Sequence, residues 1–259
     1  MTSSLVSSAR AELVAGAVIG PHQSHSRPDN LSKIRKLVGG DEGMAFGMSG
    51  MTRYSPEQVL DFVAEITGCS ADMAATGDED AIDPDLALAA IVRAAERLAA
   101  GARRGAALLV TTGHPTGLLE HNLRVADAYR AAGGVLMYPR EGEKLPLGRG
   151  RHEVRYLGGV GCLADGASLE HTHSAAAMEA LLASKPWPDL VFGDHGFAGA
   201  AIERGIPTIA VMDINDPALA VAAAEGRDVT VIPMDDNRPP RLYEPSWRIF
   251  EEVLRREQT

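Results

Sequence analysis

The pattern of apolar positions along the chain changes near residue 105. Before that point, apolar residues recur at the spacing of a helix face, so the sequence predicts a mostly helical N-terminal portion over residues 1–104. Clear helix starts lie at Ser55-Pro56 and Asp83-Pro84, where a capping side chain precedes a proline. After residue 105, short apolar runs typical of buried strands alternate with helix-like segments.

This alternation predicts the elements of an α/β fold. The predicted strands are residues 106–110, 134–137, 154–157, 190–192, 208–212 and 229–232. The predicted helices are residues 118–132, 174–184, 197–204, 218–224 and 246–256. We therefore expect one domain over residues 1–259, in which residues 105–259 form a Rossmann-like, mainly parallel, doubly wound sheet and the helical portion packs on it. Glycines between residues 139 and 166 favour a hairpin or a flap there.

Composition narrows the class of protein. The formal net charge is −10, which argues against a nucleic-acid partner or an anionic membrane surface. The two cysteines are far apart in the sequence, which fits a reducing compartment. The start Met1-Thr2-Ser3-Ser4 lacks the basic residues of a signal peptide, so we expect a cytoplasmic protein. The acidic run Asp78-Glu79-Asp80 is expected to be solvated rather than to bind a metal.

Polar side chains follow four of the predicted strands at the point where each strand ends. Because parallel strands end at one edge of a sheet, and ligands bind at that edge in open α/β folds, we expect these side chains to form one site. Histidine can act there as an acid, a base or a nucleophile, and carboxylates can bind a divalent cation. The expected catalytic residues are His114, Asp194 and His195, and the expected metal ligands are Asp194, Asp213, Asp216 and Asp235.

The loop between Thr111 and Gly117 is predicted to bind phosphate. It joins a strand to a helix, where free backbone N–H groups and the helix dipole favour an anion, although such a loop is also an ordinary helix entry. The polar segment 20–30, which carries His22 and His25, is expected to fold over the cleft. The expected phosphate-binding residues are Thr111, Thr112, Gly113, Thr116, Gly117 and Arg27.

A second candidate site is Glu170-His171-Thr172-His173. The two histidines share one face only if the segment is extended, and a third metal ligand is not near them in the sequence. The alternative is that this segment is merely the entry to the helix predicted from residue 174.

Several common enzyme motifs are absent from the sequence, including the Gly-x-x-x-x-Gly-Lys-Ser/Thr loop of Walker NTPases and the Gly-x-Ser-x-Gly elbow of hydrolases. The run Asp213-Ile214-Asn215 is similar to the Asp-x-Asp motif of haloacid-dehalogenase-type phosphatases. However, Asn215 replaces the second carboxylate, and too little chain follows for the later motifs of that superfamily. We therefore reject membership of that superfamily.

A set of short motifs runs through most of the chain: Arg27-Pro28-Asp29-Asn30-Leu31, Phe46-Gly47-Met48, Ile82-Asp83-Pro84, 112–119, 193–201, 215–219, Asp235-Asp236-Asn237 and Tyr243-Glu244-Pro245. In these motifs and their order the chain resembles a bacterial family of phosphatases of the high-GC, actinobacterial type. It departs from the family pattern at Pro28-Asp29 and at Thr116. The resemblance implies hydrolysis of a phosphate ester.

These observations together favour a phosphatase that acts on the phosphate monoester of a small metabolite, with Mg²⁺ as the expected cation. His114 would protonate the leaving group or act as the nucleophile. Two alternatives stay open: a non-catalytic protein that binds a nucleotide or a sugar phosphate, and an isomerase or lyase that acts on a phosphorylated sugar. The acidic strand ends favour catalysis, because a passive anion site gains nothing from carboxylates unless a cation is present. The expected partner is the small phosphorylated substrate, and a homodimer is left open.

Overall fold

A seven-stranded sheet lies at the centre of the protein, with strand order β3-β4-β1-β5-β6-β7 and β2 paired to β1. The computed structural model describes residues 3–75, 77, 79–147 and 150–256. The strands are β1 (Ala107–Thr112), β2 (Val135–Leu136), β3 (Glu153–Leu157), β4 (Val160–Ala164), β5 (Leu190–Gly193), β6 (Thr208–Met212) and β7 (Val229–Pro233). The apolar runs of β1, β4, β5 and β6 are buried almost throughout, as expected for strands covered on both faces, whereas Val135 on β2 is exposed.

The pairing of the strands confirms a mainly parallel sheet. All neighbouring strands run parallel except β3 and β4, which form an antiparallel hairpin in the glycine-rich segment for which a hairpin or a flap is expected. Strand β4 was not among the predicted strands, because its sequence Val160-Gly161-Cys162-Leu163-Ala164 is short and glycine-bearing. β1 pairs with β2 and β4 on one edge and with β5 on the other, so the order of strands reverses between β1 and β5.

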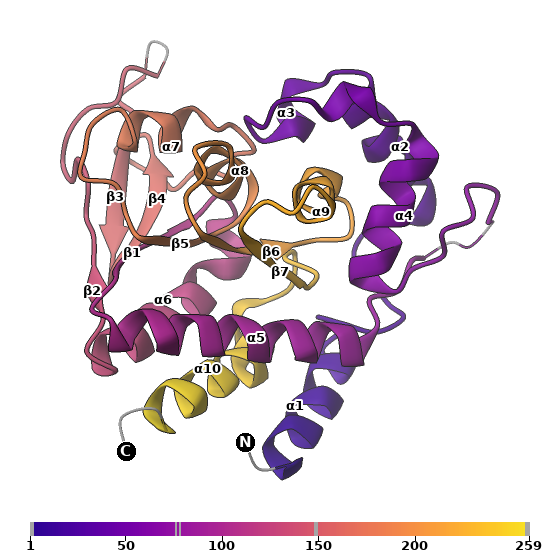
Figure 1. The fold of residues 1–259 in the computed structure, drawn as a ribbon, viewed down its shortest axis with the longest axis horizontal. Coiled ribbons are helices and arrows are strands. Elements are labelled where there is room, and N and C mark those ends of the chain that lie inside the picture. Colours follow the sequence, from indigo (N-terminus) through magenta and orange to yellow (C-terminus); the bar gives the residue numbers. More distant parts are fainter. Residues whose placement is uncertain (1–2, 76, 78, 148–149, 257–259) are drawn as a thin grey trace.

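Helices cover both faces of the sheet (Figure 1). One face carries α5 (Pro84–Arg103), α6 (Pro115–Ala131) and α10 (Glu244–Arg256), which pack against one another. The other face carries α7 (Ala176–Leu181), α8 (His195–Glu203) and α9 (Pro217–Ala224). Helices α6, α8 and α9 each begin directly after a parallel strand, so their N-termini lie at the carboxyl-terminal edge of the sheet.

The N-terminal portion is helical, as predicted, and wraps around the sheet. It comprises α1 (Ser3–Ala15), α2 (Arg27–Val38), α3 (Glu42–Ala45), the 3₁₀ helix η1 (Met51–Arg53) and α4 (Pro56–Thr67), which are followed by α5. Near the other end of the chain, a second 3₁₀ helix, η2 (Pro240–Tyr243), precedes α10. Ser55 and Gln58 form the reciprocal capping pair of α4, and Asp83 caps α5. Helix α1 packs on α5 and α10, whereas α2, α3 and α4 pack against α9.

An ion pair within this portion corrects one expectation from the sequence. Asp80 is buried, with its Oδ1 3.0 Å from Arg27 Nη1 and its Oδ2 accepting a hydrogen bond from Asn30 Nδ2. The expectation that the acidic run is solvated is therefore wrong for Asp80, because two side chains at the start of α2 satisfy its charge. Asp78 lies outside the described residues.

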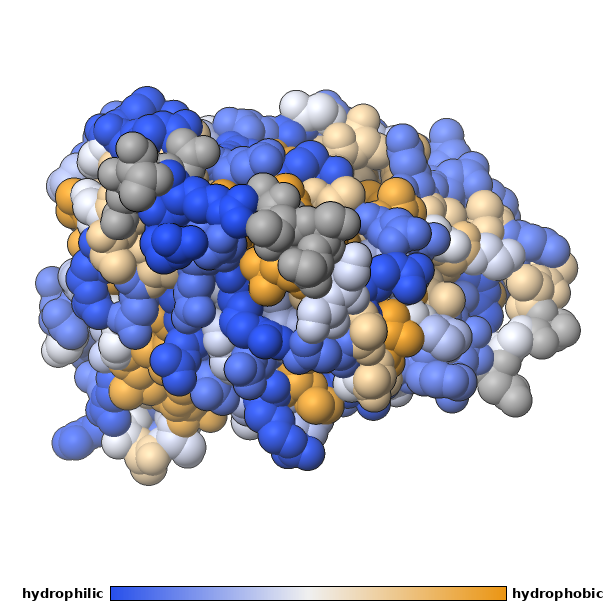
Figure 2. Space-filling view, turned by 90° about the horizontal axis from the view of Figure 1, so that it is seen from below, coloured by the Kyte–Doolittle hydropathy of each residue, from blue (hydrophilic) through white to orange (hydrophobic). Residues whose placement is uncertain are grey.

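The face that carries α1 and α10 is mostly hydrophilic, and its hydrophobic side chains form small separate patches (Figure 2). Scattered apolar side chains of this kind are ordinary on the surface of a protein. No helix in the described part of the chain is long and apolar enough to cross a membrane.

A buried histidine links α6 to α10. His121 is fully buried, with Nδ1 3.0 Å from Asn122 Oδ1 and Nε2 3.0 Å from Ser246 Oγ. Burial lowers the pKa of His121 to about 4, because neither neighbour carries a charge that would compensate a proton.

We predict that His121 makes the protein less stable as the pH falls. Between about pH 6.5 and pH 4 the unfolded chain binds a proton at this position and the folded chain does not, so folding loses about 1.4 kcal/mol per pH unit. Urea unfolding measured at pH 7 and at pH 5 should show a smaller pH dependence for His121→Gln than for the wild type. The control is Thr116→Ala, which should retain the wild-type dependence because Thr116 is exposed on the same helix and does not titrate. Equal pH dependence in His121→Gln and wild type would contradict the assignment.

Candidate functional site

A cavity of about 330 Å³ opens at the carboxyl-terminal edge of the sheet. It lies where the order of strands reverses between β1 and β5, which is the usual ligand position in open parallel sheets. Five of its lining residues are histidines, which come from four separate segments of the chain. The lining residues are His25, Lys33, His114, His171, His173, His195, Asn215, Asp236 and Asn237.

His114 lies at the junction of β1 and α6. It is the N-cap residue of α6, Pro115 occupies the first helical position, and the His114 backbone N–H donates to Thr112 Oγ1. The imidazole Nδ1 lies 3.0 Å from Asp236 Oδ1. Burial opposes protonation of this ring, but the Asp236 carboxylate outweighs burial and raises the pKa of His114.

His195 is the first residue of α8 and has a left-handed backbone conformation with φ of +43°. The neighbouring Gly196 packs against the backbone of Ser174, where a Cβ atom would lie 2.3 Å from the carbonyl carbon. This close approach fixes the turn, so the imidazole of His195 is held at the floor of the cavity.

Two carboxylates face the buried His195 ring. Its Nε2 lies 3.1 Å from Asp236 Oδ2 and 3.4 Å from Asp216 Oδ2. Burial opposes protonation of His195, yet these two carboxylates raise its pKa well above the ordinary value. In turn, burial opposes ionisation of Asp236, but His114 and His195 lower its pKa.

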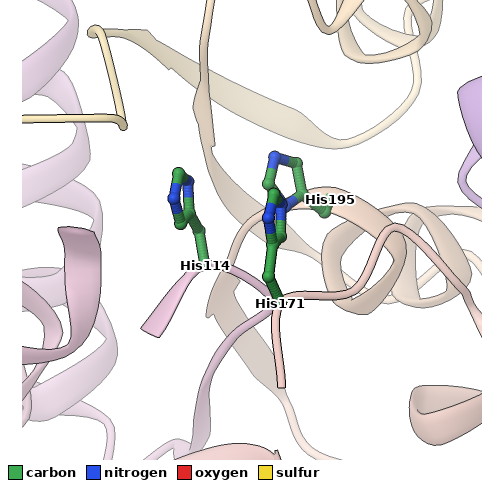
Figure 3. Close-up of side chains that lie close together, drawn as sticks. All are labelled: His114, His171 and His195. Carbon is green, nitrogen blue, oxygen red and sulfur yellow. The ribbon is translucent and has the colours of Figure 1, made fainter. Parts of the chain in front are cut away.

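His171 and His173 both line the cavity, and their segment belongs to no helix or strand. The Thr172 N–H donates to the carbonyl oxygen of Gly113 at 2.8 Å and ties the segment to the β1–α6 loop. The His171 ring stacks on His114 with ring centroids 4.4 Å apart, close to His195 (Figure 3). Burial and the neighbouring imidazoles lower the pKa of His171 to about 4.

Two groups of side chains in the described part of the chain could hold a metal ion, and they share His195. One group is His114, His171 and His195, and the other is His195, Asp216 and Asp236. Within each group the potential ligand atoms lie within 4.8 Å of one another. Imidazole nitrogens and carboxylate oxygens converging at this spacing are the usual donors for a divalent transition metal.

Buried polar atoms around these groups lack hydrogen-bond partners, which supports a cation in this region. Although His114 Nδ1 lies 3.0 Å from Asp236, the two atoms do not meet at a hydrogen-bonding angle. Among the described side chains, His195 Nδ1, Asp194 Oδ2 and Asp213 Oδ2 are likewise buried without a hydrogen-bond partner. Because unpaired buried polar atoms are costly, a cation bound here would offset that cost for several of them.

Asp194 lies beneath the cavity rather than on its lining. It is fully buried, its Oδ1 accepts a 2.6 Å hydrogen bond from the Gly113 N–H, and the same oxygen lies 3.5 Å from His195 Nδ1. Burial raises the pKa of Asp194. Asp194 is therefore placed to orient His195 and to tie β5 to the loop after β1.

Asp213 and Asp235 differ in what surrounds them. Asp213 is buried, and His25 Nε2 lies 3.4 Å from its Oδ2, so the N-terminal segment does fold over the site as expected. Burial and the neighbouring carboxylates raise the pKa of Asp213 well above its usual range. Asp235 was expected to bind a metal. Instead, it accepts hydrogen bonds from Ser24 and pairs with Arg238 at 2.9 Å, so its charge is used to anchor the segment 20–30.

The loop from Thr111 to Gly117 is arranged differently from the expected phosphate cradle. The Gly113 N–H donates to Asp194, and the N–H of Gly117 donates to the carbonyl oxygen of His114. Thr111 and Thr112 are buried, Thr116 is exposed, and none of the three lines the cavity. A Cβ atom at Gly117 would lie 2.0 Å from the backbone oxygen of Asp236. The loop therefore shapes the site, and its glycines permit close packing.

The predicted site residues thus divide into three groups. His114 and His195 line the cavity, and Asp216 faces His195. Asp194 and Asp213 support the site from beneath, whereas Arg27 pairs with Asp80 and does not line the cavity. Asp236 was not among the site residues predicted from the sequence, although its place shortly after β7 is a position where the strand-end rule predicts site residues. Nothing in the sequence pattern indicated Lys33, which lies on α2.

We predict that Asp194→Asn lowers turnover by about a hundredfold, the usual scale for disturbing an acid–base group. Asparagine keeps an oxygen for the Gly113 N–H but removes the charge that faces His195. The melting temperature should stay the same or rise, because a buried charge is removed.

The matched control is Asp228→Asn, since Asp228 pairs with Arg97 and precedes β7 at the opposite edge of the sheet. It should leave turnover unchanged. If Asp194→Asn retained normal turnover, Asp194 would have no part in the chemistry, and if it unfolded, its role would be structural.

Comparisons with known proteins show which family the chain belongs to. The sequence model of the family named Phosphatase matches residues 5–257. A Streptomyces coelicolor protein named Phosphatase SCO2771 is 40% identical to this chain over 239 residues, which is 90% of this chain and 88% of that protein. The family match includes every segment that lines the cavity. The chain belongs to the Phosphatase family.

Proposed function

We propose that this protein hydrolyses the phosphate monoester of a small metabolite with the help of a divalent cation bound in the cavity. The observation that carries the proposal is the convergence of His114, His171, His195, Asp216 and Asp236 in a chain that belongs to the Phosphatase family. The cavity volume of about 330 Å³ suits a small substrate. A passive anion-binding protein would gain nothing from buried carboxylates at this position.

The donor set favours a different cation from the one expected from the sequence. Aspartates at strand ends alone suggest Mg²⁺, but three imidazoles among the candidate ligands suit Zn²⁺ or Mn²⁺ better. A cation bound there would stabilise charge on the phosphate oxygens and lower the pKa of a bound water.

The side chains of this protein hold and orient the groups of the site. Asp194 lies against one nitrogen of His195, and Asp216 and Asp236 lie against the other, so the ring is fixed from both sides. His173 packs edge-on to Phe46 at the cavity wall, and its ring centroid lies 4.4 Å from that of His195. We propose that Asp236 likewise orients His114 as a ligand of the cation, a role that leaves this ring no proton to give to the leaving group.

We predict that activity depends on the metal. Protein stripped with a chelator should lose turnover of p-nitrophenyl phosphate and of small sugar phosphates, and Zn²⁺ or Mn²⁺ should restore turnover better than Mg²⁺ does. Metal content measured by mass spectrometry should follow activity. Full activity in protein that is shown to be metal-free would contradict the proposal.

We also predict that Asp236→Asn lowers metal content and turnover together, the latter by about a hundredfold, because one candidate ligand loses its charge. The control is Asp127→Asn, since Asp127 is exposed on α6 and pairs only with Arg130 among the described residues. That variant should keep both metal and activity. Normal metal content in Asp236→Asn would remove Asp236 from the metal site.

A further inference from the structure

Lys33 differs in charge from the rest of the cavity lining. In the described part of the chain it is the only lysine or arginine among the lining residues, and it comes from α2 rather than from a strand end. Lys33 therefore brings a positive charge to the cavity that His114, His171 and His195 also line.

The helix backbone that carries Lys33 is anchored by its neighbours on α2. On the same helix, Arg27 and Asn30 bind the buried Asp80, and Ile34 and Leu37 are buried in the core. Lys33 itself is half-buried. The backbone that carries the ammonium group is thus fixed, while the end of the side chain can move to meet a ligand.

Lys33 also lacks an acidic partner among the described residues, unlike the other basic residues near the site. Arg27 pairs with Asp80, and Arg238 pairs with Asp235. The carboxylates that face the cavity are engaged elsewhere, since Asp236 lies against His114 and His195. The charge of Lys33 is therefore available to an incoming anion.

Most backbone donors of the loop that would ordinarily bind the phosphate are already bonded. The Gly113 N–H is bonded to Asp194, the His114 N–H to Thr112, and Pro115 has no N–H. A phosphate dianion that enters beside buried carboxylates gains from positive charge on the protein, in addition to the charge of a bound cation. Lys33 on α2 supplies such charge at the cavity wall.

We propose that Lys33 binds the phosphate group of the substrate, so that the N-terminal helical portion supplies anion recognition and the strand ends supply the candidate metal ligands. The side chains of Asn215 and Asn237, which line the same cavity, can donate hydrogen bonds to the remaining phosphate oxygens. That the bound anion is part of a substrate rests on the proposed function. The binding of a phosphate dianion at Lys33 does not.

Binding of inorganic phosphate, measured by calorimetry on the full chain with its metal content determined, tests this directly. Lys33→Gln should weaken phosphate binding by about tenfold or more, because a charge-assisted hydrogen bond is lost, and Lys33→Arg should restore most of it. Lys36→Gln is the matched control, since Lys36 is exposed on the same helix, and it should bind phosphate like the wild type. In a turnover assay Lys33→Gln should raise KM more than it lowers kcat.

The outcomes separate the two proposals. Unchanged phosphate affinity in Lys33→Gln, or a wild-type protein that does not bind phosphate at millimolar concentration, would overturn the inference. Binding of phosphate that depends on Lys33, in a protein that hydrolyses no monoester, would support the inference and remove the proposed function. A loss of affinity that Lys33→Arg does not restore, with metal content also lowered, would show that Lys33 acts on the metal site instead and would equally overturn it.

Discussion

The buried carboxylate of Asp236 joins the two sides of the cavity. One oxygen lies 3.0 Å from His114, at the end of β1, and the other lies 3.1 Å from His195, at the end of β5. Taking an isolated charge out of water costs several kcal/mol, so neither ring nor carboxylate is stable there without the others. The rest of the site follows from this contact, because Asp194, Asp216 and the segment that carries His171 all place groups around these three.

The N-terminal portion completes the site as well as packing on the sheet. Asp235 lies next to Asp236 in the sequence, but its charge holds Ser24 and Arg238 instead of the cavity. That anchor brings His25 to Asp213, and the pair of Arg27 with Asp80 fixes the helix that carries Lys33. Of the two adjacent aspartates, Asp235 thus anchors the segment 20–30 and Asp236 forms part of the site.

The sequence allowed most of the elements to be predicted, because buried parallel strands and capped helices leave local signals. The strand at residues 208–212 matches β6 at both ends, and the capping pair of Ser55 and Gln58 was visible directly. For the site, the strand-end rule located His114, His195 and Asp216. It could not tell Asp235 from Asp236, because the chain turns after the end of β7 and local sequence does not reveal which of the two side chains then faces the cavity. The strand-end rule also could not show that the Gly113 N–H in the loop after β1 is already bonded, since its partner Asp194 is distant in the sequence.

The candidate metal ligands come from parts of the chain that are far apart, between His114 after β1 and Asp236 after β7. A cation bound by them would act as a cross-link between distant segments, in the way that a disulfide bond does, but one that forms only in the folded state. Because an unfolded chain offers no such arrangement, the affinity for the metal would contribute directly to the stability of the fold. The supply of metal in the cell would then determine the folded fraction of this protein as well as the activity of each molecule.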